Sequence, residues 1–160
     1  MIKLLTKLMP KKLLVFLYKK LPLPMGIKNM IVSRANKHFL VAVLGLITNN
    51  DGKILLLYHT YRKDPWGIPS GWIECEEPDE GLKREIFEET NFIVEIGRIF
   101  KTEYANKPRR INLYFRGHIK SGEFKACEEV SDYGFFDIDS LPENLSQDQK
   151  DLIIKELRRG

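Results

Sequence analysis

The sequence predicts an α+β fold in which a mixed sheet is flanked by helices, and three observations carry the prediction. At 160 residues the chain is about one domain long. Hydrophobic residues make up 43% of it, enough for a core, and 30% of the residues are charged, which suits a solvated surface. Apolar segments follow one another in the order strand, strand, helix, strands, helix, which is typical of a sheet covered by helices.

The charge of the chain is unevenly distributed. Residues 1–50 contain nine basic residues and no acidic one, whereas the rest of the chain contains 17 basic and 22 acidic residues. This asymmetry indicates a basic N-terminal segment joined to a mildly acidic body. We therefore expect a basic, amphipathic helical extension over residues 1–37 and a separate folded domain over residues 38–160.

The extension has an apolar stripe at helical spacing, formed by Leu13, Leu14, Phe16 and Leu17. Three interpretations remain open: packing on the body as an extra helix, peripheral contact with an anionic membrane surface, or homodimerisation through residues 1–24. Nucleic-acid binding is not expected, because the segment has no recognised binding motif. A secretory signal is disfavoured because the apolar stretch is short and no small-residue cleavage site follows it. We expect a cytoplasmic protein.

The first expected strands form a hairpin. Phe39–Thr48 is a long apolar, β-branched run, and Lys53–His59 is the returning strand. Between them, the sequence Asn49-Asn50-Asp51-Gly52 is a strong turn signal. A loop over residues 61–70 follows, and Gly71–Glu76 is a short strand or loop that leads to a helix.

The central helix has a clear beginning and end. Pro78 suits its first turn, where Asp79 and Glu80 face the positive end of the helix dipole. We expect the helix to run to about Thr90, because Asn91 readily adopts the left-handed conformation that ends helices.

Three more strands and a helix complete the domain. Phe92–Tyr104, Ile111–Lys120 and Val130–Ile138 are the expected strands, and Arg109 and Arg110 are expected in a loop. Ser146 is a plausible cap for a final helix that runs to about Arg159. His38, His59 and His118 are expected to be satisfied structural histidines, and Cys75 and Cys127 are too few for a disulfide scaffold.

Three glutamates of the central helix share one face. Because a helix turns 100° per residue, Glu85, Glu88 and Glu89 fall within an arc of about 100°. Like charges at these spacings each cost a few tenths of a kcal/mol, so the array needs a compensating cation. Hard cations such as Mg²⁺ prefer oxygen ligands of this kind. A solvated acidic face is the alternative explanation for such a charge run.

The segment that holds these glutamates, PSGWIECEEPDEGLKREIFEETNF over residues 69–92, resembles the Nudix box. The box places Arg-Glu-apolar-x-Glu-Glu-x-Gly-apolar on a helix. Seven residues separate the arginine from an earlier glutamate, and five residues separate that glutamate from an earlier glycine. Arg84 to Glu89 and Phe92 match this pattern, and the preceding Trp66-Gly67-Ile68-Pro69 looks like the segment that commonly precedes the box. The resemblance covers roughly residues 38–158 and implies a Nudix-like α/β/α sandwich.

The segment departs from the box in three places. Asn91 replaces the last glycine, a mild change because Asn tolerates the same backbone conformation. Ser70 stands where the family often has a glycine, and Gly71 follows it. The spacing between Gly71 and Arg84 is also one residue short. Glu76 and Glu77 are both candidates for the first box glutamate. We prefer Glu76, because Pro78 then keeps the usual place at the helix start, and expect Glu76, not Glu77, to face Arg84.

The resemblance implies the roles of the site residues. Glu85 and Glu89 are expected to bind Mg²⁺ (or Mn²⁺), and Glu88 to be a further ligand or the base that activates water. Arg84 is expected to position carboxylates, including that of Glu76. The expected substrate-binding residues are Trp66, Arg62 and Gly71, although a structural role for the tryptophan is equally consistent with the sequence. Glu128 and Glu129 are either an extra ligand or base, or a solvated turn.

The activity that the resemblance implies is metal-dependent hydrolysis of a diphosphate linkage in a substrate of the nucleoside-diphosphate-X type. Nucleotide sugars, ADP-ribose, dinucleotides, CDP-alcohols and nucleoside triphosphates all belong to the possible substrates. The alternative is a catalytically impaired nucleotide-binding sensor, which the shortened loop and Ser70 favour. Because specificity lies in loops outside the box, the sequence leaves the substrate open.

Overall fold

This computed structural model describes residues 10–20, 22 and 24–158, which form two compact units divided between Phe39 and Leu40. The first unit contains α2 (Lys11–Lys20) and α3 (Met25–Ala35). Helix α3 ends at Asn36, whose backbone and side-chain amides both donate to the carbonyl of Val32, at 3.2 and 2.8 Å. The part of the expected extension before residue 10 lies outside the described residues. None of the helices described is both long and apolar enough to cross a bilayer.

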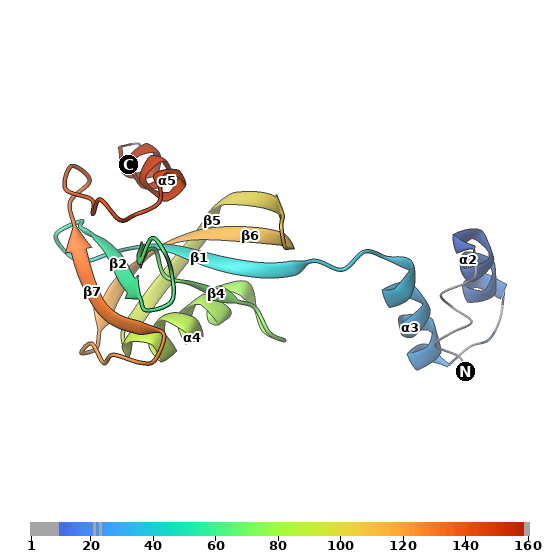
Figure 1. Ribbon diagram of the computed structural model, residues 1–160. Helices are drawn as coiled ribbons and strands as arrows, with labels where there is room; N and C mark the ends of the chain where they lie inside the picture. The colour runs from blue at the N-terminus through green and yellow to red at the C-terminus, as the bar shows by residue number, and fades with distance from the viewer. Residues whose placement is uncertain (1–9, 21, 23, 159–160) are drawn as a thin grey trace. The chain divides into compact units, whose positions relative to one another are not determined.

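The second unit is built on one seven-stranded sheet with the order β3-β2-β1-β6-β5, in which β4 also pairs with β1 and β7 with β2 (Figure 1). The strands are β1 (Leu40–Thr48), β2 (Ile54–His59), β3 (Trp66–Gly67), β4 (Ser70–Trp72), β5 (Ile93–Asn106), β6 (Arg109–Ser121) and β7 (Val130–Phe136). Strands β1 and β6 are parallel and the other pairs are antiparallel, so the expected mixed sheet is confirmed.

The turn between β1 and β2 forms as the sequence predicts. The side-chain oxygen of Asn49 accepts hydrogen bonds from the backbone amides of Asp51 and Lys53, at 3.0 and 2.9 Å. Gly52 has φ +77°, which a residue with a side chain rarely adopts. Beyond Thr48 and Ile54 the two strands separate, and β4 takes the place of β2 beside β1.

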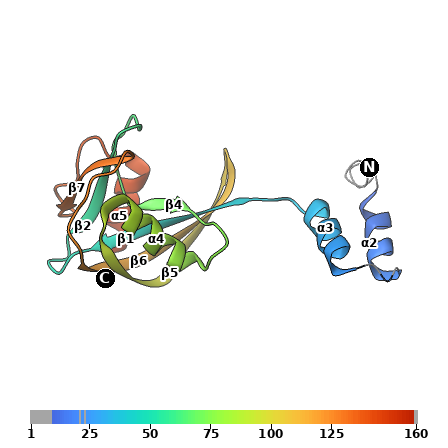
Figure 2. The same ribbon diagram turned by 90° about the horizontal axis from the view of Figure 1, so that it is seen from below.

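Two helices cover opposite faces of the sheet, which confirms the expected α/β/α sandwich. Helix α4 (Pro78–Thr90) lies on one face and α5 (Gln147–Leu157) on the other (Figure 1), and α4 crosses the strands in the foreground of Figure 2. Leu82 and Ile86 of α4 are fully buried in a core with Val43. On the other face, Leu152 and Ile153 of α5 pack in a second core.

The ends of α4 follow from its sequence. Pro78 occupies the first turn, Glu77 is the N-cap residue, and Asn91 ends the helix in the left-handed conformation with φ 63°. The backbone amide of Asn91 donates to the carbonyl of Phe87 at 2.7 Å, and its side chain donates to the carbonyl of Glu123 at 3.1 Å. The second bond gives Asn an advantage that Gly would not have at this position.

Two local predictions need correction. Arg109 and Arg110 lie in strand β6 rather than in a loop, because β5 and β6 form a long hairpin that turns only at Lys107 and Pro108. The proline and the run of charges hid the continued pairing. Ser146 precedes α5 as expected, but its side chain makes no capping hydrogen bond.

Candidate active site

Helix α4 presents its glutamates on the side that its apolar stripe leaves free. With Leu82 and Ile86 fixed in the core, Glu85 and Glu89 lie at the border of the buried face and Glu88 faces outward. The exposed fraction of the side chain falls from 58% for Glu88 to 19% for Glu85. Glu89 is buried, with only 7% of its surface exposed. The exposure of the three carboxylates to solvent therefore decreases from Glu88 through Glu85 to Glu89.

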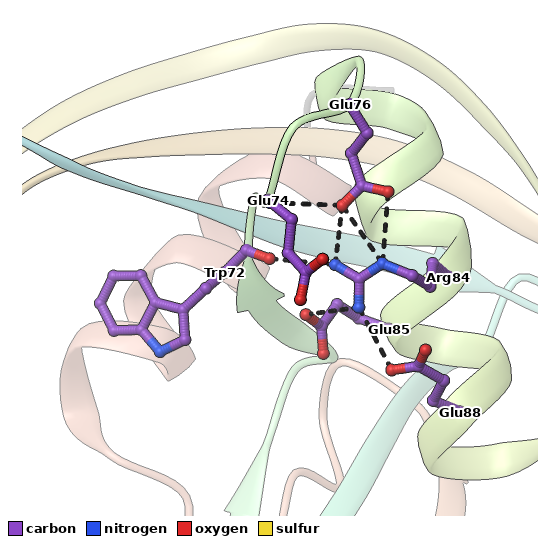
Figure 3. A network of polar contacts seen from close by, with 6 residues as sticks. All are labelled: Trp72, Glu74, Glu76, Arg84, Glu85 and Glu88. Atoms are coloured by element: carbon purple, nitrogen blue, oxygen red, sulfur yellow. Dashed lines mark hydrogen bonds and ion pairs between the residues drawn. The ribbon is translucent and has the colours of Figure 1, made fainter.

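Arg84 lies at the centre of a network that holds the carboxylates of Glu76, Glu85 and Glu88 in place (Figure 3). Its Nη1 donates to Glu85 Oε1 at 3.0 Å and to Glu88 Oε2 at 3.2 Å. Its Nη2 donates to Glu76 Oε1 at 2.7 Å and to the backbone carbonyl of Trp72 at 3.1 Å. A planar guanidinium with several donors suits such a role, because each donor fixes one acceptor in direction.

Glu76, not Glu77, faces Arg84. Both carboxylate oxygens of Glu76 accept a hydrogen bond from Arg84 Nε at 3.2 Å, whereas Glu77 is exposed at the helix N-cap. The bonds from Arg84 hold the pKa of Glu76 below its usual value. A Cβ atom at Gly81 would stand 3.0 Å from Glu76 Oε1, so the absence of a side chain there leaves room for Glu76. The shortened loop therefore still brings a glutamate to the arginine.

Gly71 lets strand β4 approach Glu85. A Cβ atom at this glycine would overlap the carboxylate of Glu85. The backbone of β4 and the Glu85 side chain can therefore be in contact only because residue 71 has no side chain. Burial raises the pKa of Glu85 above its usual value, against the effect of Arg84. The sequence did not reveal this close approach, because it depends on how β4 and α4 meet.

Glu89 is the least satisfied carboxylate of the site. Its Oε2 is buried and has no hydrogen-bond partner among the described residues. Burial raises its pKa to about 8, and the negative charges of Glu85, Glu129 and Glu88 add to the rise while Arg62 opposes it. A buried carboxylate surrounded by other carboxylates is stabilised by a cation, so the donor set fits a hard metal ion.

The cation-holding arrangement is not preformed. Within residues 10–20, 22 and 24–158, no three His, Cys, Asp or Glu side chains stand in a geometry that would hold a metal ion. Arg84 engages two of the three helix carboxylates instead.

The loop before β7 brings another glutamate to the helix. Thr60 fixes this loop: its backbone amide donates to the carbonyl of Glu129 at 3.0 Å, and its hydroxyl donates to that of Glu128 at 2.9 Å. Both glutamates line a hollow of about 310 Å³ together with Glu85, Glu88 and Glu89. Glu129 stands close enough for its charge to raise the pKa of Glu89. The loop is therefore part of the site's surroundings rather than a remote turn.

A cleft of about 720 Å³ opens beside these carboxylates. Arg62 and Gly71, both expected to contact substrate, line it together with Arg84, Glu85 and Glu89. Such a volume is in the range of small-molecule sites.

Trp66 lines neither this cleft nor the hollow beside Glu128 and Glu129. Its ring packs edge-on against Tyr58 and Phe136, with centroids 5.3 and 5.1 Å away. The structure thus favours the structural role for Trp66 over the substrate contact.

A second hollow of about 780 Å³ adjoins the cleft, and Leu44, Arg110, Asn112 and Gln149 line both. Gln149 is fixed there because its Oε1 accepts a hydrogen bond from the backbone amide of Ile68 at 2.9 Å. The sequence interpretation missed Asn112 and Gln149. The available signal was the alternation of Arg110, Asn112 and Tyr114, which places all three on one face of a strand.

His59 has the expected structural position but not the expected hydrogen-bond partners. It is fully buried, edge-on to Tyr61 with ring centroids 5.8 Å apart, and is not grouped with other potential metal ligands among the described residues. Neither ring nitrogen has a hydrogen-bond partner in the described structure, so it is structural but not satisfied. Burial, with a smaller effect of the Arg62 charge, lowers its pKa to about 4.

The sequence of this chain is similar to those of known proteins. A family model described as "NUDIX domain" matches residues 38–155. A relative named ADP-ribose pyrophosphatase, from Methanocaldococcus jannaschii, is 33% identical over 130 residues, which cover 76% of this chain and 75% of the relative. A MutT-like protein from Streptomyces ambofaciens is 28% identical over 109 residues, which cover 67% of this chain and 70% of that protein.

Solved structures of other proteins have folds similar to that of this chain. The crystal structure of an ADP-ribose pyrophosphatase from Streptococcus suis 89-1591 is 26% identical, with a TM-score of 0.62 over 76% of this chain and 93% of that one. The crystal structure of a UDP-X diphosphatase covers 99% of this chain and 94% of that one, with a TM-score of 0.66. Its identity of 21% is a likeness of fold alone.

Proposed function

We propose, from the premise that this chain belongs to the Nudix family and is a Nudix pyrophosphohydrolase, that it cleaves the diphosphate linkage of nucleoside-diphosphate-X substrates with the help of Mg²⁺ or Mn²⁺. The observation that carries the proposal is Glu89, a buried and unpartnered carboxylate beside carboxylates that Arg84 holds in place. A site that had no cation to bind would gain nothing from such an arrangement.

The Nudix family generally uses divalent metal ions. In this chain Glu85, Glu88 and Glu89 are the residues that would hold one. A bound cation of this kind neutralises phosphate charge and lowers the pKa of water, which diphosphate hydrolysis requires. The ordinary preference of Mg²⁺ for carboxylate oxygens supports its assignment.

The remaining residues have supporting roles. Arg84 and Glu76 orient the helix carboxylates through their shared hydrogen bonds. Arg62, which lines the cleft, would neutralise a phosphate of the substrate, and Gly71 keeps the approach to Glu85 open. The base that accepts the proton of water is Glu88, Glu128 or Glu129, because all three line the hollow beside Glu89.

Among substrates of this type, ADP-ribose has the strongest support. The relative from Methanocaldococcus jannaschii carries that activity in its name and is 33% identical, and the named ADP-ribose pyrophosphatase from Streptococcus suis is 26% identical. A screen of the full chain with Mg²⁺ tests the proposal across ADP-ribose, dinucleotides, nucleotide sugars, CDP-alcohols and nucleoside triphosphates. We expect turnover of ADP-ribose, and no turnover of any substrate would contradict the proposal.

The second candidate function is nucleotide sensing without cleavage. It is favoured by the absence, in the described residues, of a preformed metal-holding arrangement and by the hold of Arg84 on Glu85 and Glu88. Tight binding of one nucleotide in the same screen, without its hydrolysis, would support the sensor. Turnover that saturates with Mg²⁺ would exclude it.

Residues 1–37 form, in this proposal, an appendage to a catalytic domain over residues 38–160. In α2, Leu13 and Phe16 are exposed alongside exposed lysines, a combination that suits peripheral contact with an anionic membrane or homodimerisation. Flotation with vesicles that contain phosphatidylglycerol tests the first possibility, and the mass in solution tests the second. Both cysteines are free, which is consistent with the cytoplasmic location that we expect.

A further inference from the structure

The floor of the second hollow is a ladder of polar side chains on strands β5 and β6. Side chains two residues apart on a strand share a face, so Arg110, Asn112 and Tyr114 point the same way. In the pairing of β5 with β6, Glu103 stands opposite Asn112 and Lys101 opposite Tyr114. This face is the one that α5 covers, since Tyr114 belongs to the core on that side.

Hydrogen bonds fix the ladder. Arg110 Nε donates to Asn112 Oδ1 at 2.9 Å, and the hydroxyl of Tyr114 donates to Glu103 Oε2 at 2.7 Å. Lys101 Nζ donates to the same oxygen of Glu103 at 3.4 Å and lies 4.7 Å from the centre of the Tyr114 ring. Asn112, between Arg110 and Tyr114, is itself buried.

Arg110 occupies the junction between the two hollows. It is one of the four residues that line both, and it forms no ion pair with any described residue. Two other arginines of the same unit are neutralised, Arg84 by three glutamates and Arg116 by Glu156. The charge of Arg110 therefore remains available to an anion that enters from the carboxylate cleft.

Glu103, which lines the second hollow but not the cleft, supplies the opposite chemistry. An ionised carboxylate only accepts hydrogen bonds, so its natural ligand groups are hydroxyls and N–H groups. Asp148, Asp151 and Glu156 also line this hollow and oppose the charges of Lys101 and Lys155, so its lining has no excess of positive charge to attract a further phosphate. The group that suits this environment is uncharged and rich in hydroxyls.

We propose that Arg110 and Glu103 form a second substrate subsite, in which Arg110 contacts the phosphate farther from helix α4 and Glu103 accepts hydrogen bonds from the hydroxyls of the sugar attached to it. The proposal rests on the proposed function, because a diphosphate held at the carboxylates is what directs its other end across Arg110. It makes the two residues determinants of specificity for diphosphates that end in a sugar or nucleoside.

The test measures binding separately from hydrolysis. The full chain with Mg²⁺ is titrated with the methylene-bridged analogue of ADP-ribose, in which carbon replaces the oxygen that links the phosphorus atoms. Arg110→Gln and Glu103→Gln are each expected to weaken its Kd about tenfold, the loss of one charge-assisted hydrogen bond. Methylenebisphosphonate, which has no sugar, is expected to bind Glu103→Gln as it binds wild type.

Two matched variants control for the loss of charge. Arg109→Gln removes the neighbouring arginine, which is exposed and alternates to the other face of β6. Glu95→Gln removes a glutamate of β5 that pairs with Lys120 and lines neither hollow. Both are expected to bind the analogue as wild type does.

The outcomes separate this proposal from the proposed function. Wild-type affinity in Arg110→Gln or Glu103→Gln, equal losses in the control variants, or no binding of the analogue by wild type would each overturn the subsite. If wild type hydrolyses ADP-ribose but the two variants bind the analogue as tightly as wild type does, the proposed function stands and the subsite is wrong. If the variants lose affinity as expected but wild type does not hydrolyse ADP-ribose, the subsite stands and the proposed function is wrong.

Discussion

Glu89 carries the largest electrostatic cost of any residue in the site. Its carboxylate is buried, its Oε2 has no partner among the described residues, and three neighbouring glutamates add to the rise in its pKa. Residues that reduce stability in this way are usually retained for function. The same residue therefore connects the stability of the protein with its proposed activity.

Replacement of Glu89 by Gln is expected to separate these two effects. The variant removes a buried charge, so its melting temperature at pH 8 without metal should equal or exceed that of wild type. It should also lower kcat at least about 100-fold, which corresponds to a loss of about 3 kcal/mol of transition-state stabilisation. The control is Glu80→Gln on the same helix, an exposed glutamate paired with Lys83, which should leave both quantities unchanged. Near-normal turnover in Glu89→Gln would contradict the metal assignment.

The raised pKa of Glu89 also predicts a dependence of stability on pH. The folded state binds this proton more tightly than the unfolded state, so its contribution to stability is lost as the pH rises from about 4.5 to about 8. His59, with a pKa lowered to about 4, acts in the opposite direction below pH 6.5. We therefore compare wild type with Glu89→Gln, in which His59 is unchanged. Without metal, the advantage in melting temperature of the variant should grow from pH 5 to pH 8, and a constant difference would show that Glu89 is not perturbed.

At the scale of elements, the site depends on how closely strand β4 and helix α4 meet. The sequence predicts the bounds of the helix well, because Pro78 and Asn91 are strong local signals at its two ends. It also predicts the pairing of Glu76 with Arg84, since both belong to one short segment. The contact of Gly71 with Glu85 is not predictable in this way, because it depends on the packing of two elements.

Gly71→Ala tests this contact. The added methyl group would overlap the carboxylate of Glu85, so the strand or the side chain must move. We expect a fall in kcat of about tenfold or more, because displacements of about 1 Å in catalytic groups have such effects. The matched control is Gly26→Ala, where a Cβ atom meets no neighbour within 4 Å, and it should keep wild-type turnover. Unchanged activity in Gly71→Ala would mean that the position of Glu85 does not limit catalysis.

At the scale of the whole molecule, local patterns predict the layers of the fold but not the extent of the substrate site. Helix and strand periodicity predicts the α/β/α sandwich, because each element must bury its apolar side. The second hollow depends on contacts between distant parts of the chain: β6 lies parallel to β1, and Gln149 of α5 reaches the backbone of Ile68. No local pattern specifies such pairings, so the roles of Arg110 and Asn112 emerge only from the structure.

The division of the chain into two units predicts that the N-terminal extension is dispensable for chemistry. A chain that begins at His38 should unfold cooperatively and keep the kcat of the full chain, because every proposed site residue lies in the second unit. The measurements are thermal unfolding and ADP-ribose hydrolysis. A large loss of kcat with cooperative unfolding intact would mean that the extension takes part in the site.

The central claim is that carboxylates of helix α4 hold a divalent cation that the cleavage of a diphosphate requires. The most direct test is the rate of ADP-ribose hydrolysis by the full chain as Mg²⁺ is added back after EDTA treatment, with Glu85→Gln measured alongside. We predict no turnover in EDTA, a rise that saturates with Mg²⁺ in wild type, and a rate at least about 100-fold lower in the variant at every concentration. Turnover that persists in EDTA, or equal rates in wild type and Glu85→Gln, would contradict the claim.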